Sequence, residues 1–592
     1  MSLLQILNTG MQHLPLELVQ EIVSFATVST REGVPTYDKN HLSSLRLVCK
    51  CFKFAADPLL FSEINFDFHD DYLSKVIGYF QTLSKKTHPA CRYAKTLRIK
   101  SFPDHPFCFP HEYHSLSAWI SKAIQALVNV RAVYWTITGR RYDILWSINE
   151  GLFTLPNLEE LHLEFYELRI LQWQAPDMIP LRRFRNLRSI DIKGHNLSAE
   201  CAADFVVQLR AILKSGGSIN RIGLSLPSWY GVSEDDLHIL HKVLQNTPPK
   251  SNLPLQHLRL QGYTLKLDSV TLPHLRHLTS LDVSQAIGMH IGDARLNYQH
   301  LWDDLKSASI YIKDLRVSEI GRDLLGYLKA YSGLQKLTVI GEPLFRIGHM
   351  DDMGYAIAAE EARQISHELY SSVLPRHKES LVAFMGLNYV EWLTPSYLTA
   401  DEMASLSVCK KLHSVAISLQ TSEIIDDKYV NIKNIIETAL MLPEITYIRL
   451  SYSRKRVKSR HYACCINRRN INRIKTKIET ILNSIQLRCN SRWSCGLQQR
   501  ELVFEGTWYI FSLKDDGHIG LVMEVSSIDD VDLGLHSGFT GVPQAFKFQS
   551  PFQRRDASAA MLSVHYVHLP VPHLRVMRMR TKLKLDRNSS IR

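Results

Sequence analysis

Long hydrophobic runs are missing from this chain of 592 residues. A membrane-spanning helix takes about 18 or more consecutive apolar residues, and the most apolar stretch, residues 119–137, contains Lys122 and Arg131. The opening, MSLLQILNTGMQHLP, has neither the basic segment nor the small-residue cleavage site of a secretory signal. We therefore expect no membrane partner. We also expect a protein of the cytoplasm and/or nucleus, whose ten cysteines are reduced thiols.

The sequence patterns of common catalytic sites are missing as well. It contains no Walker loop, Rossmann glycine pattern, nucleophile elbow or HExxH helix. The segment His111-Glu112-Tyr113-His114 misses the zincin spacing by one residue and is predicted to lie in a loop. Five further residues have spacings that fit no standard zinc finger: His461, Cys464, Cys465, Cys489 and Cys495. We predict no catalytic residues, no metal site and no cofactor, and so no enzyme activity of the chain's own.

Acidic residues are scarce in one segment only. The net charge is +12, from 70 Lys and Arg against 58 Asp and Glu. Residues 451–500 hold thirteen of the basic residues and a single acid, Glu479, so this segment alone carries +12. The basic character is therefore local, which argues against nucleic-acid binding by the chain as a whole. Within the segment, residues 454–460 have the composition of a nuclear localisation signal or of a solvated basic loop, and both interpretations stay open.

A short apolar pattern recurs along residues 93–455. Each copy has one apolar residue, two others, and then two apolar residues separated by one, as in Leu158-Leu161-Leu163. The copies begin at residues 94, 130, 158, 187, 219, 255, 278, 312, 334, 381, 412 and 445. The alternating pair predicts a strand with one buried face, and amphipathic stretches such as residues 203–213 predict helices between the strands. Because one strand and helix cannot bury an apolar face alone, the pattern predicts an α/β solenoid of stacked repeats.

Residues 11–62 carry a different pattern, of two short helices. Pro15 stands at the start of an amphipathic stretch with Leu18 and Ile22 at helical spacing, which predicts a first helix. A second helix, ending before Pro58, is predicted from four more apolar residues at helical spacing: Leu42, Leu45, Val48 and Phe52. About fifty residues cannot build a self-sufficient core. Their surplus apolar surface therefore indicates a partner.

This segment resembles the F-box. The opening LP-x-x-L-x-x-x-I lies at residues 14–22, and the second signature comprises LRLVCKCF at 45–52 and AADPLLF at 55–61. The chain departs from the family where Phe61 replaces a frequent Trp and where residues 26–41 lengthen the first loop. Together with the leucine-rich pattern, it is similar to the large F-box families of fungi. The resemblance covers residues 11–62 and, less specifically, about 90–455.

The resemblance implies a substrate-recognition subunit of an SCF-type cullin-RING ubiquitin ligase. The F-box would dock on the adaptor subunit, and through it on the cullin, while the repeats bind an unknown protein substrate. The implied adaptor-binding residues are Leu14, Pro15, Leu18, Ile22, Leu45, Val48, Cys49 and Phe52. The implied architecture is a short all-α F-box (11–62), a linker (63–92), an irregular leucine-rich-repeat-like solenoid (93–455) and a basic helix with a strand-rich capping region (456–592).

Two alternatives stay open. The copies are irregularly spaced and lack an asparagine ladder, so a generic α/β domain with leucine-rich strands also fits. A nuclear repeat protein that acts as a scaffold or binds nucleic acid through the 454–477 basic block would fit the charge. Few aromatic residues interleave with that block, which argues against base stacking.

A basic helix is predicted over residues 466–488. At 100° per residue, one arc collects six apolar residues: Ile471, Ile474, Ile478, Ile481, Leu482 and Ile485. The remaining circumference carries Arg468, Arg469, Arg473 and Lys475, a candidate face for an acidic or phosphorylated partner. Downstream, residues 501–513 and 519–525 are strand-like and are joined by an Asp-Gly turn signal. Residues 574–580 are also strand-like, and these strands are predicted to close the solenoid.

Overall fold

The computed structural model describes most of the chain between residues 15 and 526. The described ranges are 15–31, 34–67, 73–100, 110–138, 142–166, 179–194, 199–214, 218–225, 238–245, 253–284, 299–340, 360–361, 363–386, 405–420, 429–453, 463–485, 487–488, 500–504, 507–513 and 518–526. The strand-like stretch at 574–580 and the basic run at 454–460 lie outside them. Within these ranges, no helix combines the length and the apolar character that crossing a membrane requires.

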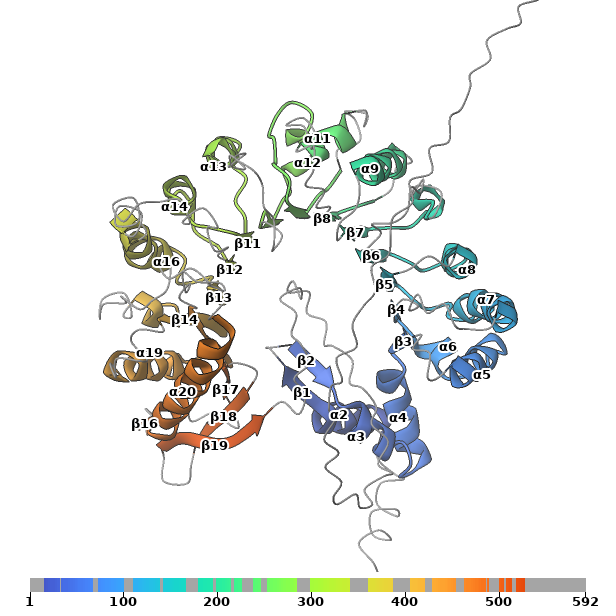
Figure 1. Ribbon diagram of the computed structural model, residues 1–592, viewed down its shortest axis with the longest axis horizontal. Helices are drawn as coiled ribbons and strands as arrows, with labels where there is room; N and C mark the ends of the chain where they lie inside the picture. Colours follow the sequence, from blue (N-terminus) through green and yellow to red (C-terminus); the bar gives the residue numbers. More distant parts are fainter. Residues whose placement is uncertain are drawn as a thin grey trace, which may run out of the picture. The chain divides into compact units, whose positions relative to one another are not determined.

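Fourteen parallel strands form one long sheet, so the chain is of mixed α/β class (Figure 1). The first thirteen strands follow the order of the sequence: β3 (Glu63–Asp67), β4 (Thr96–Lys100), β5 (Ala132–Thr138), β6 (Glu160–Tyr166), β7 (Ser189–Gly194), β8 (Arg221–Ser225), β9 (His257–Gln261), β10 (Ser280–Asp282), β11 (Asp314–Val317), β12 (Lys336–Val339), β13 (Ala383–Gly386), β14 (Ser414–Gln420) and β15 (Tyr447–Ser453). The last is β17 (Arg500–Phe504), which pairs in parallel with β15. The sheet is open, because no pairing among the described strands joins β3 to the C-terminal strands.

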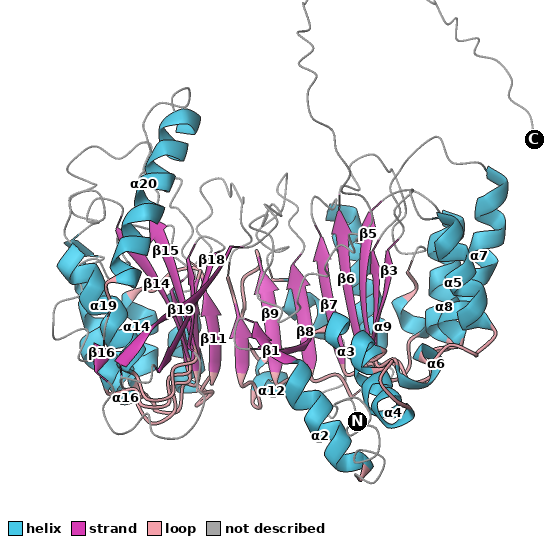
Figure 2. Cartoon of the chain, turned by 90° about the horizontal axis from the view of Figure 1, so that it is seen from below, coloured by secondary structure: helices cyan, strands magenta, loops and turns pink. Residues whose placement is uncertain are grey.

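Helices connect the strands and cover the outer side of the curved sheet, as Figure 1 shows and the turned view of Figure 2 confirms. They are α5 (Leu73–Ser84), α6 (Ala90–Tyr93), α7 (Pro110–Gln125), α8 (Tyr142–Phe153), α9 (Ala199–Lys214), α11 (Ile239–Leu244), α12 (Leu272–Leu275), α13 (Gln299–Ser307), α14 (Arg322–Lys329), α16 (Leu374–Arg376) and α19 (Tyr429–Met441), with the short turns η3 (Leu181–Arg183) and η5 (Leu369–Val373). The predicted helix at 203–213 is confirmed within α9. The segment 111–114, predicted as a loop, instead lies in the first turn of α7.

Every copy of the apolar pattern becomes a strand, and the strands pair at the same repeat position. One apolar column runs through the core, with each member at most 5% exposed: Ile64, Leu97, Val133, Leu161, Ile190, Ile222, Leu258, Leu281, Leu315, Leu337, Phe384, Val415, Ile448 and Leu502. Shifting one strand by a single residue would turn its apolar side chains to the other face, so this pattern strongly specifies the register.

A ladder of backbone hydrogen bonds joins successive repeats. One carbonyl near the start of each strand accepts the N–H groups of two successive residues of the next strand, at 2.7–3.2 Å. The carbonyl of Glu159, for example, accepts from Arg188 and Ser189. The acceptors are Ser62, Lys95, Arg131, Glu159, Arg188, Asn220, Gln256, Thr279, Lys313, Gln335, Val382 and His413. Main-chain atoms make these bonds, so stacking at these positions does not depend on the side chain. In three successive repeats a side chain adds to them: Asn129, Asn157 and Asn186 each donate to a carbonyl of the preceding repeat, at 2.8–3.0 Å, which is a short asparagine ladder that the sequence pattern did not reveal.

The parallel sheet extends beyond both predicted limits. Residues 63–92, predicted as a linker, contain β3, α5 and α6, and Ile64 and Phe66 of β3 are buried in the core. At the other end β17 lies past residue 455, and the predicted strand 501–513 is two strands, β17 and β18 (Thr507–Leu513). β18 pairs antiparallel with β17 and with β19 (His518–Ser526), which confirms the predicted hairpin. The predicted helix 466–488 is α20 (Ala463–Asn483); it ends early because Leu487–Arg488 forms strand β16 against β19.

The N-terminal helical unit, residues 15–60, has its own small core. Helices α2 (Leu16–Thr27), α3 (Lys39–Leu45) and α4 (Lys50–Leu60) bury six residues together: Val19, Val23, Leu42, Phe52, Ala55 and Ala56. The single second helix predicted here is instead two, because Cys49 is extended (φ −160°), and α4 continues through Pro58. The prediction of an all-α unit is also wrong. The lengthened first loop forms an antiparallel hairpin of β1 (Val28–Arg31) and β2 (Val34–Tyr37).

Candidate functional site

Exposed apolar side chains concentrate on the N-terminal helical unit. Seven of the twelve exposed large apolar residues in the described chain lie between residues 16 and 54, and Tyr37 is one of them. The other six, which we call the N-terminal apolar surface, are Leu16 (45% exposed), Leu18 (43%), Ile22 (40%), Leu47 (85%), Val48 (53%) and Phe54 (55%). The remaining five exposed apolar residues are spread over residues 128–408. A small unit with this much apolar surface is suited to bind a partner.

Some of the predicted adaptor-binding residues are exposed, and others are buried in the core of the helical unit. Leu18, Ile22 and Val48 belong to the N-terminal apolar surface, and Pro15 is exposed just before α2. Phe52 instead lies in the unit's core at 5% exposure, so its role is to pack the helices. Leu45 and Cys49 are partly buried against the same core, and Leu14 lies outside the described residues. Sequence reasoning missed Leu16, Leu47 and Phe54.

Phe61 connects the helical unit to the sheet. Its side chain packs against the main core and meets the His88 ring edge-on, with centroids 5.1 Å apart. The Arg46 guanidinium lies over Phe61, 5.2 Å from the ring centroid, and pairs with the buried Asp57 carboxylate at 2.6 Å. This aromatic ring thus joins the helical unit to the main core through apolar and ring contacts.

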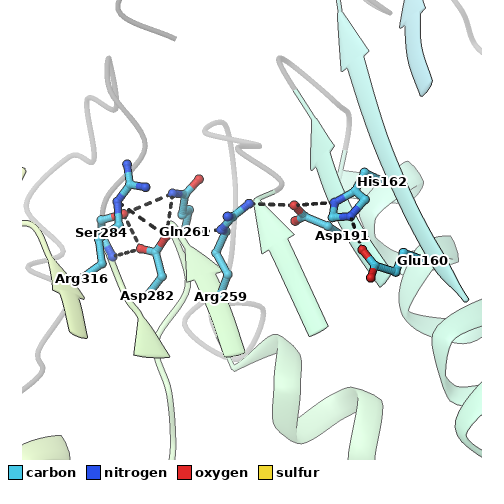
Figure 3. Close-up of polar contacts among 8 residues, drawn as sticks. All are labelled: Glu160, His162, Asp191, Arg259, Gln261, Asp282, Ser284 and Arg316. Carbon is cyan, nitrogen blue, oxygen red and sulfur yellow. Dashed lines mark hydrogen bonds and ion pairs between the residues drawn. The ribbon is translucent and has the colours of Figure 1, made fainter. Parts of the chain in front are cut away.

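A row of polar residues crosses the inner face of the sheet, opposite the helices. The row, which we call the polar row, has one member on each strand from β4 to β11: Arg98, Tyr134, His162, Asp191, Gly223, Arg259, Asp282 and Arg316. Strict pairing of the strands places these residues side by side, about 4.8 Å apart from strand to strand. Figure 3 shows the contacts from His162 to Arg316.

The first half of the polar row is a stack of flat groups. The Arg98 guanidinium lies 4.5 Å from the centroid of Tyr134, which stacks on His162 at 4.3 Å with an interplanar angle of 7°. The His162 imidazole is also held between two carboxylates, at 3.4 Å from Asp191 and 3.6 Å from Glu160. Its hydrogen bond lowers the pKa of Glu160.

Gly223 allows an ion pair to cross its strand. Arg259 donates to the Asp191 carboxylate at 2.7 Å, although β8 lies between their strands. A Cβ at Gly223 would approach the Asp191 Oδ1 atom to 2.1 Å, so a side chain there would displace the carboxylate. Burial acts to raise the pKa of Asp191, but Arg259 and His162 outweigh it and hold the pKa well below its usual range. Asp191 is therefore a carboxylate at neutral pH.

Asp282 is the acceptor at the other end of the polar row. Its Oδ1 accepts from the Ser284 N–H at 3.1 Å and the Ser284 hydroxyl at 2.6 Å. Its Oδ2 accepts from Gln261 at 3.3 Å and pairs with the Arg259 Nε at 3.3 Å. The Arg316 Nε is more distant, at 3.7 Å (Figure 3). Asp282 thus accepts three hydrogen bonds and makes an ion pair with Arg259 without any contribution from Arg316.

Helix α20 shows its predicted apolar stripe and part of its predicted basic face. Ile474, Ile478, Ile481, Leu482 and Ile485 are buried in the main core. Arg473 is exposed, whereas Lys475 lies 3.7 Å from Glu479 in an ion pair. The side chains of Arg468, Arg469 and Ile471 lie outside the described residues, as do those of the five candidate zinc ligands. The basic face is therefore partly neutralised by the one acid of the segment.

Across the ranges that the structure describes, no group of three or more His, Cys, Asp or Glu residues could hold a metal ion. The chain matches no protein-family model, and no curated protein is similar to it.

Proposed function

We propose that the chain is a non-catalytic substrate-recognition subunit of an SCF-type ubiquitin ligase. In this proposal residues 11–62 are an F-box that binds the adaptor subunit, and the parallel sheet with its helices is a leucine-rich-repeat-like solenoid that binds the substrate. The observation that carries the proposal is the N-terminal apolar surface, which lies on a three-helix unit with its own core.

The energetics support an interface there. Covering a fully exposed Leu, Ile, Val or Phe side chain contributes about 1.5–3 kcal/mol. The six residues are 40–85% exposed, so together they contribute roughly 5–10 kcal/mol. Association costs about 4–15 kcal/mol in lost freedom of motion. The apolar term alone is therefore of the right size to offset much of the association cost, and polar contacts at the rim would add specificity.

Adaptor binding tests the proposal. Co-expressed with a fungal SCF adaptor subunit, the full chain should co-purify with it at equal stoichiometry. Val48→Asp should abolish co-purification, because it places a charge in the interface, and the melting temperature should hardly change, because Val48 is 53% exposed.

Val207→Asp is the matched control, since Val207 is 60% exposed but lies on α9. It should retain the adaptor. If the wild-type chain leaves the adaptor unbound, the receptor assignment fails. If both variants lose it equally, the loss does not come from the N-terminal apolar surface.

A further inference from the structure

Arg316 has hydrogen-bonding capacity that the polar row does not use. A guanidinium carries five N–H donors. Among the described residues its one polar contact is the 3.7 Å approach of Nε to Asp282, beyond hydrogen-bonding distance. Figure 3 shows the two terminal nitrogens without a contact. The side chain is 14% exposed, so solvent reaches it.

The charges around Arg316 do not balance. In the polar row from β7 to β11, Asp191 and Asp282 compensate Arg259 and Arg316, and Arg98 at the other end pairs with Glu63 of β3 at 3.2 Å. From β7 to β12 the neighbouring row on the same face adds Arg221 on β8, Asp314 on β11 and Lys336 on β12. The next acid of that row, Glu160 on β6, lies against His162. Neither Arg221 nor Lys336 has an ion pair among the described residues. Between β7 and β12 these two rows therefore carry one surplus positive charge.

We propose that Arg316 binds a carboxylate of an acidic segment in the protein substrate, with Lys336 assisting. The proposal rests on the proposed function, because it assumes that the sheet captures the substrate. The two terminal guanidinium nitrogens can donate two parallel hydrogen bonds to the two oxygens of one carboxylate. A single surplus charge fits one carboxylate better than a doubly charged phosphate.

A peptide-binding experiment tests the site. Fluorescein-labelled hexaglutamate is titrated with the full-length protein at low salt, and fluorescence anisotropy gives the dissociation constant. Arg316→Gln should weaken binding about tenfold, which corresponds to the loss of one charge-assisted contact of about 1.4 kcal/mol. Lys336→Gln, at an exposed position, should weaken it two- to threefold.

Arg322→Gln is the matched control, since Arg322 lies on α14, on the helix side of the sheet, and is 60% exposed. It should bind hexaglutamate as the wild type does. If the wild type does not bind hexaglutamate, or if all the variants bind equally, the proposal is wrong. A phosphoserine peptide of equal length that binds more tightly, and depends more on Arg316, would overturn the assignment to a carboxylate.

Two controls separate this proposal from the proposed function. The melting temperature of Arg316→Gln shows whether the variant is folded, and Lys336→Gln tests the site if it is not. Adaptor co-purification is measured on the same preparations and should be unaffected by either substitution. If the adaptor does not bind but hexaglutamate binds through Arg316, the ligase assignment fails and the anion site stands.

Discussion

His377 holds a neutral imidazole in the core between α14 and α16. Its side chain is 1% exposed; Nδ1 accepts the Leu334 N–H at 3.2 Å, and Nε2 lies 3.1 Å from the Leu328 carbonyl, to which it donates. Burial lowers the pKa of His377 to about 4, and Arg376 adds to the effect. The imidazole therefore satisfies two backbone groups of the preceding repeat in its uncharged form.

The residue-scale prediction is a loss of stability in acid. In the unfolded chain His377 has a pKa near 6.5, so it takes up a proton there before it does so in the folded chain. The unfolding free energy should therefore fall as the pH drops from about 6.5 to 4, by about 3 kcal/mol from this residue. Urea unfolding between pH 7 and pH 4 measures it.

His377→Gln is the matched variant, since an amide can accept and donate in the same place without titrating. Its unfolding free energy should fall less over this pH range. An unchanged pH dependence in the variant would show that other groups cause the acid loss.

At the scale of elements, the strands set the register between successive repeats, and the helices bury the apolar face of the sheet. Each strand aligns by its apolar column and its backbone ladder, and helices such as α14 bury Leu324, Leu325 and Leu328 against the strands. Helix α20 follows the same rule although it lies beyond the apolar repeats found in the sequence. One face of α20 is thus structural, and the exposed Arg473 lies outside it.

The element-scale prediction concerns these two faces of α20. Ile478→Asp puts a charge at a position with 0% exposure and should lower the unfolding free energy by about 3 kcal/mol or more. Arg473→Glu should change it by no more than about 0.5 kcal/mol, because the side chain is exposed. Thermal unfolding of both variants gives the comparison. Equal destabilisation would mean that Arg473 is a structural residue.

At the scale of residues 15–526, the N-terminal helical unit and the sheet have separate cores, and a small third cluster of Met385, Ala416 and Tyr447 lies within the sheet. The core of the N-terminal helical unit and the main core share no buried residue, and the main core runs from Ile64 to Phe511. Phe61 and the Ser62 carbonyl belong with the sheet, since Phe61 packs on the main core and Ser62 accepts from Lys95 and Thr96. The boundary between the two cores therefore falls before Phe61 and not at residue 62.

The whole-molecule prediction follows from this boundary. Removing residues 1–59 should leave the sheet folded, with a melting temperature close to that of the full chain, and should abolish adaptor binding. Removing residues 1–67 should lower the melting temperature clearly, because Ile64 and Phe66 are lost and β4 becomes an edge strand. Circular dichroism melts of the two truncations make the test. Equal melting temperatures would show that β3 contributes nothing.

The sequence alone predicted the strands with the full apolar pattern, because alternation is a local property that each strand carries by itself. It missed β3 as a strand, and it predicted β17 as part of a strand at 501–513 but not as a further copy of the repeat. Phe61, Ile64 and Phe66 do form the same pattern, but Phe61 was assigned to the F-box signature. Strand β17 has Leu502 and Phe504 but Gln499 where the first apolar residue would stand.

Some residues of the candidate sites could also be predicted from the sequence, and others could not. The helical spacing of Leu18 and Ile22 was enough to select them, whereas the exposure of Leu47 and Phe54 depends on the break between α3 and α4. The polar row was not predictable, because Asp191 and Arg259 are 68 residues apart and meet only when the strands are in register. Local periodicity therefore determined which segments are strands and helices. Only tertiary packing decided which faces are exposed and which charges meet, since both depend on residues distant in the sequence.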